Sequence, residues 1–142
     1  MLAHLVGPEA QQSSQIISGV RSWDQASLVF KLAEKMVRLS NELLKIVRIV
    51  ALQKILSGLM CNVEYRAIKV KSGTAHGLSP KLAIMDELGQ ILGPHDPFVE
   101  AIETSQGAHL SPLLIAISTH ASTDGDSFYN WLDDAAHAKT QE

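Results

Sequence analysis

The chain has 142 residues, of which 46% are hydrophobic and 19% are charged, and its formal net charge is −3. This length suits about one domain, and the apolar content is sufficient for a core, which excludes a disordered chain. The apolar runs are too short to span a bilayer, and the N-terminus lacks the pattern of a signal peptide. Cys61 is the only cysteine, so no intrachain disulfide can form, and a reducing, intracellular setting is expected.

Charge is distributed unevenly along the chain. Residues 21–81 hold 11 of the 12 basic residues and four acids, whereas residues 82–142 hold one lysine and ten acids. The split indicates a basic face for nucleic acid and an acidic face for a protein partner. The alternative is that the two halves neutralise one another across the fold.

The first half of the chain predicts a strand, a helix and a second strand. Residues 15–20 form a short apolar strand. Ser22 and Gln25 have the spacing of a capping box, and the apolar residues that follow recur at helical spacing, which predicts a helix from about residue 23 to 39. Ser40 marks a second helix start. Residues 43–59 fit either a strand or a helix, and residues 63–70 alternate like a half-exposed strand.

The second half predicts two further strands and two helices. The apolar run at residues 82–85 and that at 112–117 lack alternation, which is typical of strands covered on both faces in a parallel sheet. Asp96 can cap a helix with Pro97 at its first position, ending by residue 107. Apolar spacing at residues 128–135 predicts a last amphipathic helix. Strands that alternate with helices indicate an α/β fold with a mostly parallel sheet.

Two adjacent acids carry the strongest chemical signal. Asp86 and Glu87 directly follow the apolar run at residues 82–85, and open α/β sheets bind ligands at the carboxyl ends of their strands. In nucleoside triphosphatases with a phosphate-binding loop, such a strand is the Walker B motif, whose aspartate helps to hold Mg²⁺. The adjacent carboxylate is suited to orienting the attacking water. The alternative is a buried strand that ends in two solvated acids.

Two other groups of residues stand near strand ends. Ser118 and Thr119 follow the second apolar run and could sense the γ-phosphate, or could simply form a turn. His76 lies in a polar loop before the acid-bearing strand and could contact nucleotide or DNA, or could belong to a connector. The six histidines and Cys61 have no zinc-ligand spacing, and no serine-hydrolase elbow is present.

In combination, these segments resemble the ATPase domain of the large terminase subunit of tailed phages. The resemblance covers most of the chain, from about residue 6 to 135, and is most specific between residues 74 and 90. It depends on the order and spacing of five segments: Arg21-Ser22-Trp23-Asp24-Gln25-Ala26, Glu64-Tyr65-Arg66-Ala67, Thr74-Ala75-His76-Gly77-Leu78-Ser79-Pro80, Asp86-Glu87-Leu88-Gly89-Gln90 and Ile117-Ser118-Thr119.

The resemblance implies roles for individual residues. Asp86 resembles the Walker B aspartate, and Glu87 resembles the catalytic glutamate that activates water. Ser118 and Thr119 resemble the coupling motif that links hydrolysis to movement. Arg21 and Gln25 match a family pattern after a strand, where a phosphate or DNA contact by Arg21 competes with a solvated surface position. ATP and Mg²⁺ are the cofactors that the resemblance implies.

The sequence departs from the family in one decisive respect. The family has a Walker A loop, rich in glycine and ending in Lys-Ser or Lys-Thr, whose backbone cradles the phosphates. Nothing here fits, because Gly7-Pro8-Glu9-Ala10 has one glycine and no lysine. We therefore expect residues 1–142 to be a partial ATPase domain in a partial P-loop fold, without a nuclease domain. The isolated chain is expected to bind ATP weakly or not at all.

Three hypotheses about function follow. The first is a segment of the ATP-driven motor that packages DNA for a phage or prophage, with double-stranded DNA, the small terminase subunit and the portal as implied partners. The second is a remnant without catalysis that binds a protein through its acidic half. The third is a nucleic-acid-binding module that uses the basic middle. The host cytoplasm is the implied location, no membrane contact is expected, and a homo-oligomer is compatible with the family.

Overall fold

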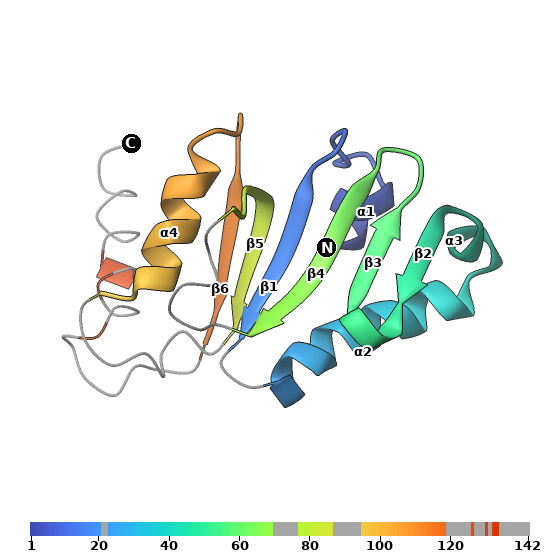
Figure 1. Ribbon diagram of the computed structural model, residues 1–142, viewed down its shortest axis with the longest axis horizontal. Helices are drawn as coiled ribbons and strands as arrows, with labels where there is room; N and C mark the ends of the chain where they lie inside the picture. The colour runs from blue at the N-terminus through green and yellow to red at the C-terminus, as the bar shows by residue number, and fades with distance from the viewer. Residues whose placement is uncertain are drawn as a thin grey trace.

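The described residues form a six-stranded mixed sheet flanked by helices (Figure 1). The computed structural model describes residues 1–20, 23–69, 77–86 and 95–118, together with residues 126, 130, 132 and 133. The strands lie in the order β2-β3-β4-β1-β5-β6, where β4, β1, β5 and β6 are mutually parallel and β3 runs antiparallel to both of its neighbours. The predicted α/β fold with a mostly parallel sheet is confirmed. The strand bounds are β1 (Gln15–Val20), β2 (Val47–Val50), β3 (Ile55–Gly58), β4 (Val63–Lys69), β5 (Pro80–Asp86) and β6 (Leu113–Ile117).

The helices follow the signals in the sequence. They are α1 (Leu2–Val6), α2 (Trp23–Leu39), α3 (Asn41–Ile46) and α4 (Pro97–Gln106), with one 3₁₀ turn, η1 (Ala51–Gln53). The predicted bounds of α2 are confirmed. The carboxylate of Asp96 accepts hydrogen bonds from the backbone N–H groups of Phe98 and Val99 at 2.9 and 3.0 Å, so its predicted role as the cap of α4 is also confirmed.

The region that the sequence left ambiguous contains both kinds of element. The Ser40 hydroxyl accepts a hydrogen bond from the Leu43 N–H at 3.2 Å and begins the short helix α3, which ends where the β-branched run begins. That run becomes β2, which pairs with β3 in an antiparallel hairpin. Lys54 turns the chain in a left-handed conformation, with φ of 55°. The helical pattern therefore describes α3, and the extended pattern describes β2, which follows it directly.

Helices cover both faces of the sheet, but they cover different strands on each face. The α2 face is the side on which α1 and α2 pack, mainly against β1, β3 and β4, and the α4 face is the opposite side, where α4 packs on β5 (Figure 1). Buried side chains form one cluster on each face. The α2-face cluster includes Ile16, Tyr65, Leu82 and Ile84, and the α4-face cluster includes Ile17, Ala83, Met85 and Ile102. Alternation along the buried strands sends successive side chains into the two clusters.

A glycine fixes the approach of α1 to the sheet. A Cβ atom at Gly58 would lie 2.3 Å from the carbonyl oxygen of Leu5, which is fully buried. Only a residue without a side chain leaves room for the backbone of α1 against β3 at this point. None of the described helices has the length and apolarity that crossing a membrane requires.

The prediction for the last strand is wrong in one respect. The run at residues 112–117 was expected to be covered on both faces, but β6 is an edge strand of the described sheet. Leu113, Ile115 and Ile117 are 42%, 37% and 53% exposed. Register with β5 places all three on the α2 face, which α2 does not cover there, while Leu114 and Ala116 pack against the α4-face cluster. Continuous hydrophobicity therefore did not distinguish this strand from the buried β5.

Candidate functional site

The carboxyl ends of β5 and β6 lie side by side. Asp86 is the last residue of β5 and is paired in register with Ile117, the last residue of β6. Ser118 follows at once, and both Asp86 and Ser118 are partly exposed. The sequence predicted that Asp86 and Ser118 would lie at one sheet edge, and the structure places their backbones there. Their roles stay predictions.

The buried body of β5 positions this edge. Residues 80–85 of that strand are all buried, between β1 on one side and β6 on the other, so the strand is held along its whole length. The first partly exposed residue is Asp86. Strand pairing therefore fixes the backbone of Asp86 at the carboxyl edge, which is where open sheets bind their ligands.

A lysine that sequence reasoning did not select stands at the same edge. Lys69 is the last residue of β4 and pairs with Val20 at the end of β1. Alternation places Lys69 and Asp86 on the α2 face, separated by β1 alone, about 10 Å apart between backbones at the usual strand spacing. No ion pair involves Lys69 within the described ranges. The alternation of residues 65, 67 and 69 in the sequence indicates that they share one face of the sheet. Only the strand order shows that β4 lies near β5.

The remaining predicted site residues lie outside the described set or are only partly described. Glu87, Thr119, Arg21 and His76 all fall outside the described residues. The backbone of Gln25 lies in the first turn of α2, which begins three residues after β1 ends. Figure 1 shows α2 beginning at the end of the sheet to which the β1 and β4 arrows point. This places the backbone of Gln25 near the carboxyl edge, and its role stays a prediction.

Contacts at the opposite end of the strands fix the offset between β5 and β6. Lys81 is only 6% exposed, and its ammonium group donates to the carbonyl oxygens of Leu110 and Ser111, with 2.5 Å to the latter. The Gln106 amide donates to the Leu113 carbonyl oxygen at 3.1 Å. These bonds hold the loop that leads into β6, and so they help to set where β6 ends beside Asp86.

A contact between Ser79 and His109 does not have the geometry of a catalytic serine–histidine pair. The Ser79 hydroxyl lies 3.1 Å from Nε2 of His109, but the same nitrogen lies 2.8 Å from the Ser79 carbonyl oxygen. A carbonyl can only accept, so Nε2 carries a proton and donates to it. That nitrogen cannot then remove a proton from the hydroxyl, which excludes a serine nucleophile in this arrangement.

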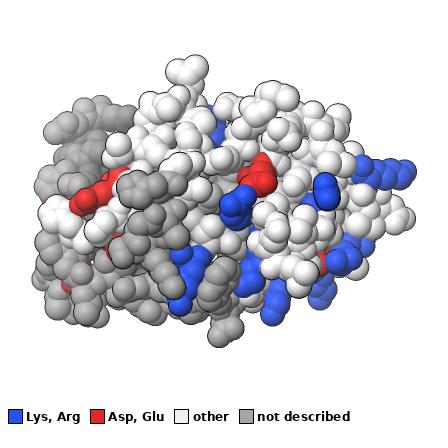
Figure 2. Space-filling view, viewed as in Figure 1, with Lys and Arg blue, Asp and Glu red and all other residues white. Residues whose placement is uncertain are grey.

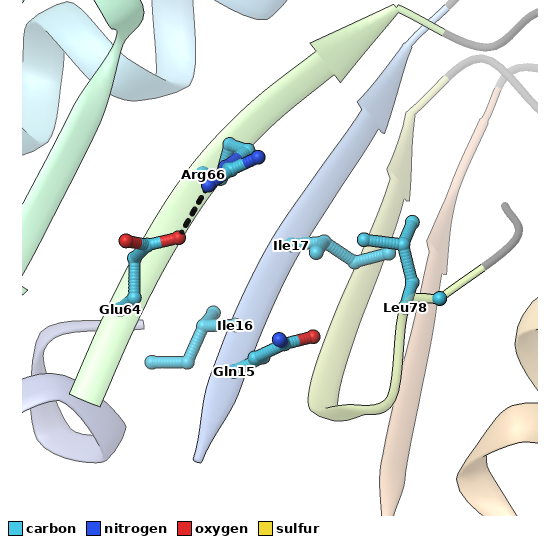
Figure 3. A pocket seen from close by; sticks show the side chains of 7 residues that line it. Gln15, Ile16, Ile17, Glu64, Arg66 and Leu78 are labelled. Carbon is cyan, nitrogen blue, oxygen red and sulfur yellow. Dashed lines mark hydrogen bonds and ion pairs between the residues drawn. The ribbon is translucent and has the colours of Figure 1, made fainter. Parts of the chain in front are cut away.

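The described polar pocket lies away from the acid. A pocket of about 280 Å³ is lined by Gln15, Ile16, Ile17, Glu64, Arg66, Gly77 and Leu78 (Figure 3). Arg66 and Glu64 form an ion pair of 2.8 Å on β4 beside it. Ile16 is four residues before the end of β1, so the pocket is about 13 Å from the carboxyl edge at the usual strand rise. It is therefore not the site that the acid and the hydroxyl define.

A buried hydrogen bond supports the central strands beneath the edge. The Ser18 hydroxyl lies 2.7 Å from the Tyr65 hydroxyl, and both residues are almost fully buried. Burial raises the pKa of Tyr65 because the phenolate would be poorly solvated, and the bond to Ser18 lowers this pKa by a smaller amount. The pair joins β1 to β4 two residues before the end of β1 and four residues before the end of β4.

Comparison with known proteins agrees with this fold. The family model described as the terminase large subunit, ATPase domain, matches residues 1–137. The architecture is that of a P-loop-like ATPase domain, since structural neighbours are terminase ATPase domains. The chain belongs to the family of terminase large subunit ATPase domains.

Two phage proteins are among the relatives of this chain. The large terminase subunit of Enterobacteria phage HK97 is 56% identical over 139 residues, which make up 98% of this chain and 28% of that protein. The crystal structure of the HK97 bacteriophage large terminase matches 97% of this chain and 29% of its own with a TM-score of 0.89. The ATPase domain of the Thermus phage P74-26 large terminase shares the fold, at 22% identity and a TM-score of 0.65, over 86% of this chain and 53% of its own. This chain thus spans less than a third of the HK97 protein.

Proposed function

We propose that residues 1–142 contribute the Walker B and coupling elements of a terminase motor that packages DNA. In this proposal Asp86 assists metal binding, Glu87 activates the attacking water, and Ser118 and Thr119 form the coupling motif. The observation that supports it is the register of Asp86 with Ile117, because a metal-binding acid and a sensing hydroxyl must both reach one triphosphate.

The described residues fit ATP with Mg²⁺ only as part of a larger site. Mg²⁺ is usually held by one or two carboxylates together with water and phosphate oxygens, so a single partly exposed Asp86 is adequate. No group of three metal-ligating side chains occurs among the described residues. When bound, the ion would neutralise charge on the phosphates.

The chain's own side chains have separable tasks in this scheme. Asp86 would orient the ion from the end of β5, and Ser118 would follow the loss of the terminal phosphate from the end of β6. Lys69 would add positive charge on the same face, two strands from Asp86. Arg21, Gln25 and His76 are proposed nucleotide or DNA contacts on the sequence resemblance alone.

The proposal treats this chain as a partial ATPase domain. No Walker A loop is encoded in the 142 residues, so we expect weak or absent binding of Mg²⁺-ATP by the isolated chain. Calorimetric titration checks this, and tight binding would contradict it. The same proposal includes ATP hydrolysis by the complete motor. Its partners would be double-stranded DNA, the small terminase subunit and the portal. Its origin would be a phage or prophage, and its location the host cytoplasm.

A chimeric terminase tests the motor assignment. The 139 matched residues of the HK97 large terminase are replaced by this chain, and ATP hydrolysis is measured with and without DNA. We expect hydrolysis to be retained and Asp86→Asn or Glu87→Gln to lower kcat by about a hundredfold or more. Glu103→Gln removes an acid from α4 and serves as the matched control. A folded, active chimera that tolerates Asp86→Asn would refute the assignment.

A binding role without catalysis is the second candidate. Arg48 on β2 and Arg66 on β4 lie on the α4 face where α4 does not reach, and both side chains are exposed. Two guanidinium groups on an open sheet face are suited to phosphate contacts. Duplex DNA affinity that falls steeply with salt, and falls further in Arg48→Gln and Arg66→Gln, would favour this candidate. Affinity that is indifferent to both substitutions would exclude it.

A further inference from the structure

Helix α2 exposes a second apolar face in addition to the one that it buries. Phe30, Ala33 and Val37 pack into the core, whereas four large apolar side chains point away from it. Those four are Leu28, Leu32, Met36 and Leu39, which are 58%, 57%, 58% and 77% exposed. At about 100° per residue they fall within an arc of about 80° on the helix surface. We call these four residues the α2 stripe.

The α2 stripe differs from the scattered apolar side chains that any surface has. Residues three or four apart on a helix are surface neighbours, so the four side chains form one continuous ridge. The ridge is about 16 Å long, from Leu28 to Leu39, at the usual rise per residue. Contiguous apolar area of this kind marks a surface that another element covers.

One edge of the α2 stripe is basic. Lys31 and Lys35 flank it, and neither has an ion pair within the described part of the chain, whereas Arg38 is paired with Glu34 at 2.7 Å. A shallow pocket of about 340 Å³ runs along this edge, lined by Lys31, Glu34, Lys35, Arg38 and Leu39. Figure 2 shows Lys and Arg side chains gathered over the α2 side of the molecule, with few acids among them.

We infer that the α2 stripe binds an amphipathic helix of a partner protein, whose apolar ridge is edged by aspartate or glutamate. A ridge of three turns offers the i, i+4 pattern that packs into the grooves of another helix. Acids on the partner would lie opposite Lys31 and Lys35 and would fix its register and orientation. The inference does not depend on nucleotide binding.

Two other occupants fit the same surface less well. Duplex DNA would pair with Lys31 and Lys35 but would leave the leucines in water. Two copies of α2 packed antiparallel would bring their basic edges together, and two copies packed parallel would leave Lys31 and Lys35 without an opposite charge. Only an acidic apolar helix satisfies both the ridge and its edge.

Two synthetic peptides of about 20 residues test the inference, because shorter helices are marginal in water. They share one leucine ridge and differ only in carrying glutamate or lysine along its edge. Fluorescence anisotropy with the 142-residue chain should give at least about tenfold tighter binding of the acidic peptide. Leu32→Glu should abolish binding, and the double variant Lys31→Glu, Lys35→Glu should reverse the preference. Leu52→Glu changes a fully exposed leucine outside the stripe and should have no effect.

Each contrary result is decisive. Equal binding of both peptides, or no binding of either, would overturn the inference. A dimer of the chain, measured by light scattering and lost in Leu32→Glu, would assign the surface to a second copy. Duplex DNA binding that is lost in the double lysine variant and kept in Leu32→Glu would assign it to nucleic acid. The lysine variant keeps the apolar ridge intact, so it remains informative even if Leu32→Glu alters folding.

Discussion

Asp86, the last residue of β5, is paired in register with Ile117, the last residue of β6, and Ser118 follows one residue beyond this pair. The pairing of Asp86 with Ile117 is set by backbone hydrogen bonds along the two strands. It makes the carboxyl edge of the sheet the part of the molecule on which substitutions are most informative.

Lys69 should affect nucleotide affinity more than turnover. In the chimeric terminase, Lys69→Gln removes a positive charge on the face of Asp86, and the loss of one charge-assisted hydrogen bond, about 1.5–3 kcal/mol, predicts a rise in KM for ATP of roughly ten- to a hundredfold. Steady-state kinetics measure this directly. Lys45→Gln removes an exposed lysine from α3 and is the control. An unchanged KM would show that Lys69 does not face the phosphates.

Stability should fall at alkaline pH because of Tyr65. Its pKa is raised in the folded protein, chiefly by burial, while the unfolded chain ionises near the ordinary value of about 10. Above that pH the unfolded state loses a proton that the folded state keeps, so the free energy of unfolding decreases until the folded-state pKa is passed. Urea denaturation from pH 8 to pH 11, about the useful range for such titration, should show a steeper decline for the wild type than for Tyr65→Phe. Parallel curves would contradict the prediction.

The cap of α4 should contribute about 1 kcal/mol to stability. Asp96→Ala removes the acceptor for two backbone N–H groups at the start of the helix, and such substitutions cost about 0.5–2 kcal/mol. Asp96→Asn keeps a capping oxygen and should cost less. Thermal unfolding compares the three proteins, and equal stability of the alanine and asparagine variants would mean that the cap is not the relevant interaction.

The buried ammonium of Lys81 should stabilise the loop before β6. Lys81→Met keeps the length of the side chain but leaves the carbonyl groups of Leu110 and Ser111 without their donor, at a cost of about 1–3 kcal/mol for a buried unsatisfied group. Removing a buried charge offsets part of this loss. Chemical denaturation measures the net effect against Lys45→Met. A Lys81→Met protein as stable as the wild type would show that other donors replace the ammonium group.

Local signals in the sequence were sufficient for much of the fold. The capping residues Asp96 and Ser40 and the helical spacing in α2 depend on neighbours in the chain, and all three predictions are confirmed. The position of Asp86 at the end of a strand was predicted for the same reason, because an apolar run that ends in an acid is a local pattern. The sequence resemblance and the structure agree on the class of fold.

Features that depend on sheet order were not accessible from the sequence. Leu113 and Ile115 have the same apolar character as the buried residues of β5, but an edge position leaves them exposed. The sequence did not indicate that Lys69 lies near Asp86, because β4 and β5 are not neighbours in the sheet. Strand β1, which precedes both of them in the chain, lies between them. The roles of Glu87, Thr119, Arg21 and His76 stay predictions, since these residues lie outside the described ranges.

Gly58 has a consequence for how genes of this kind can vary. Every single-base change in a glycine codon that alters the residue introduces at least one carbon atom where the Leu5 carbonyl oxygen leaves 2.3 Å. A point mutation at this position therefore cannot be accommodated unless the backbone of α1 moves away from β3. Across a population of such genes we expect position 58 to remain glycine while neighbouring positions vary.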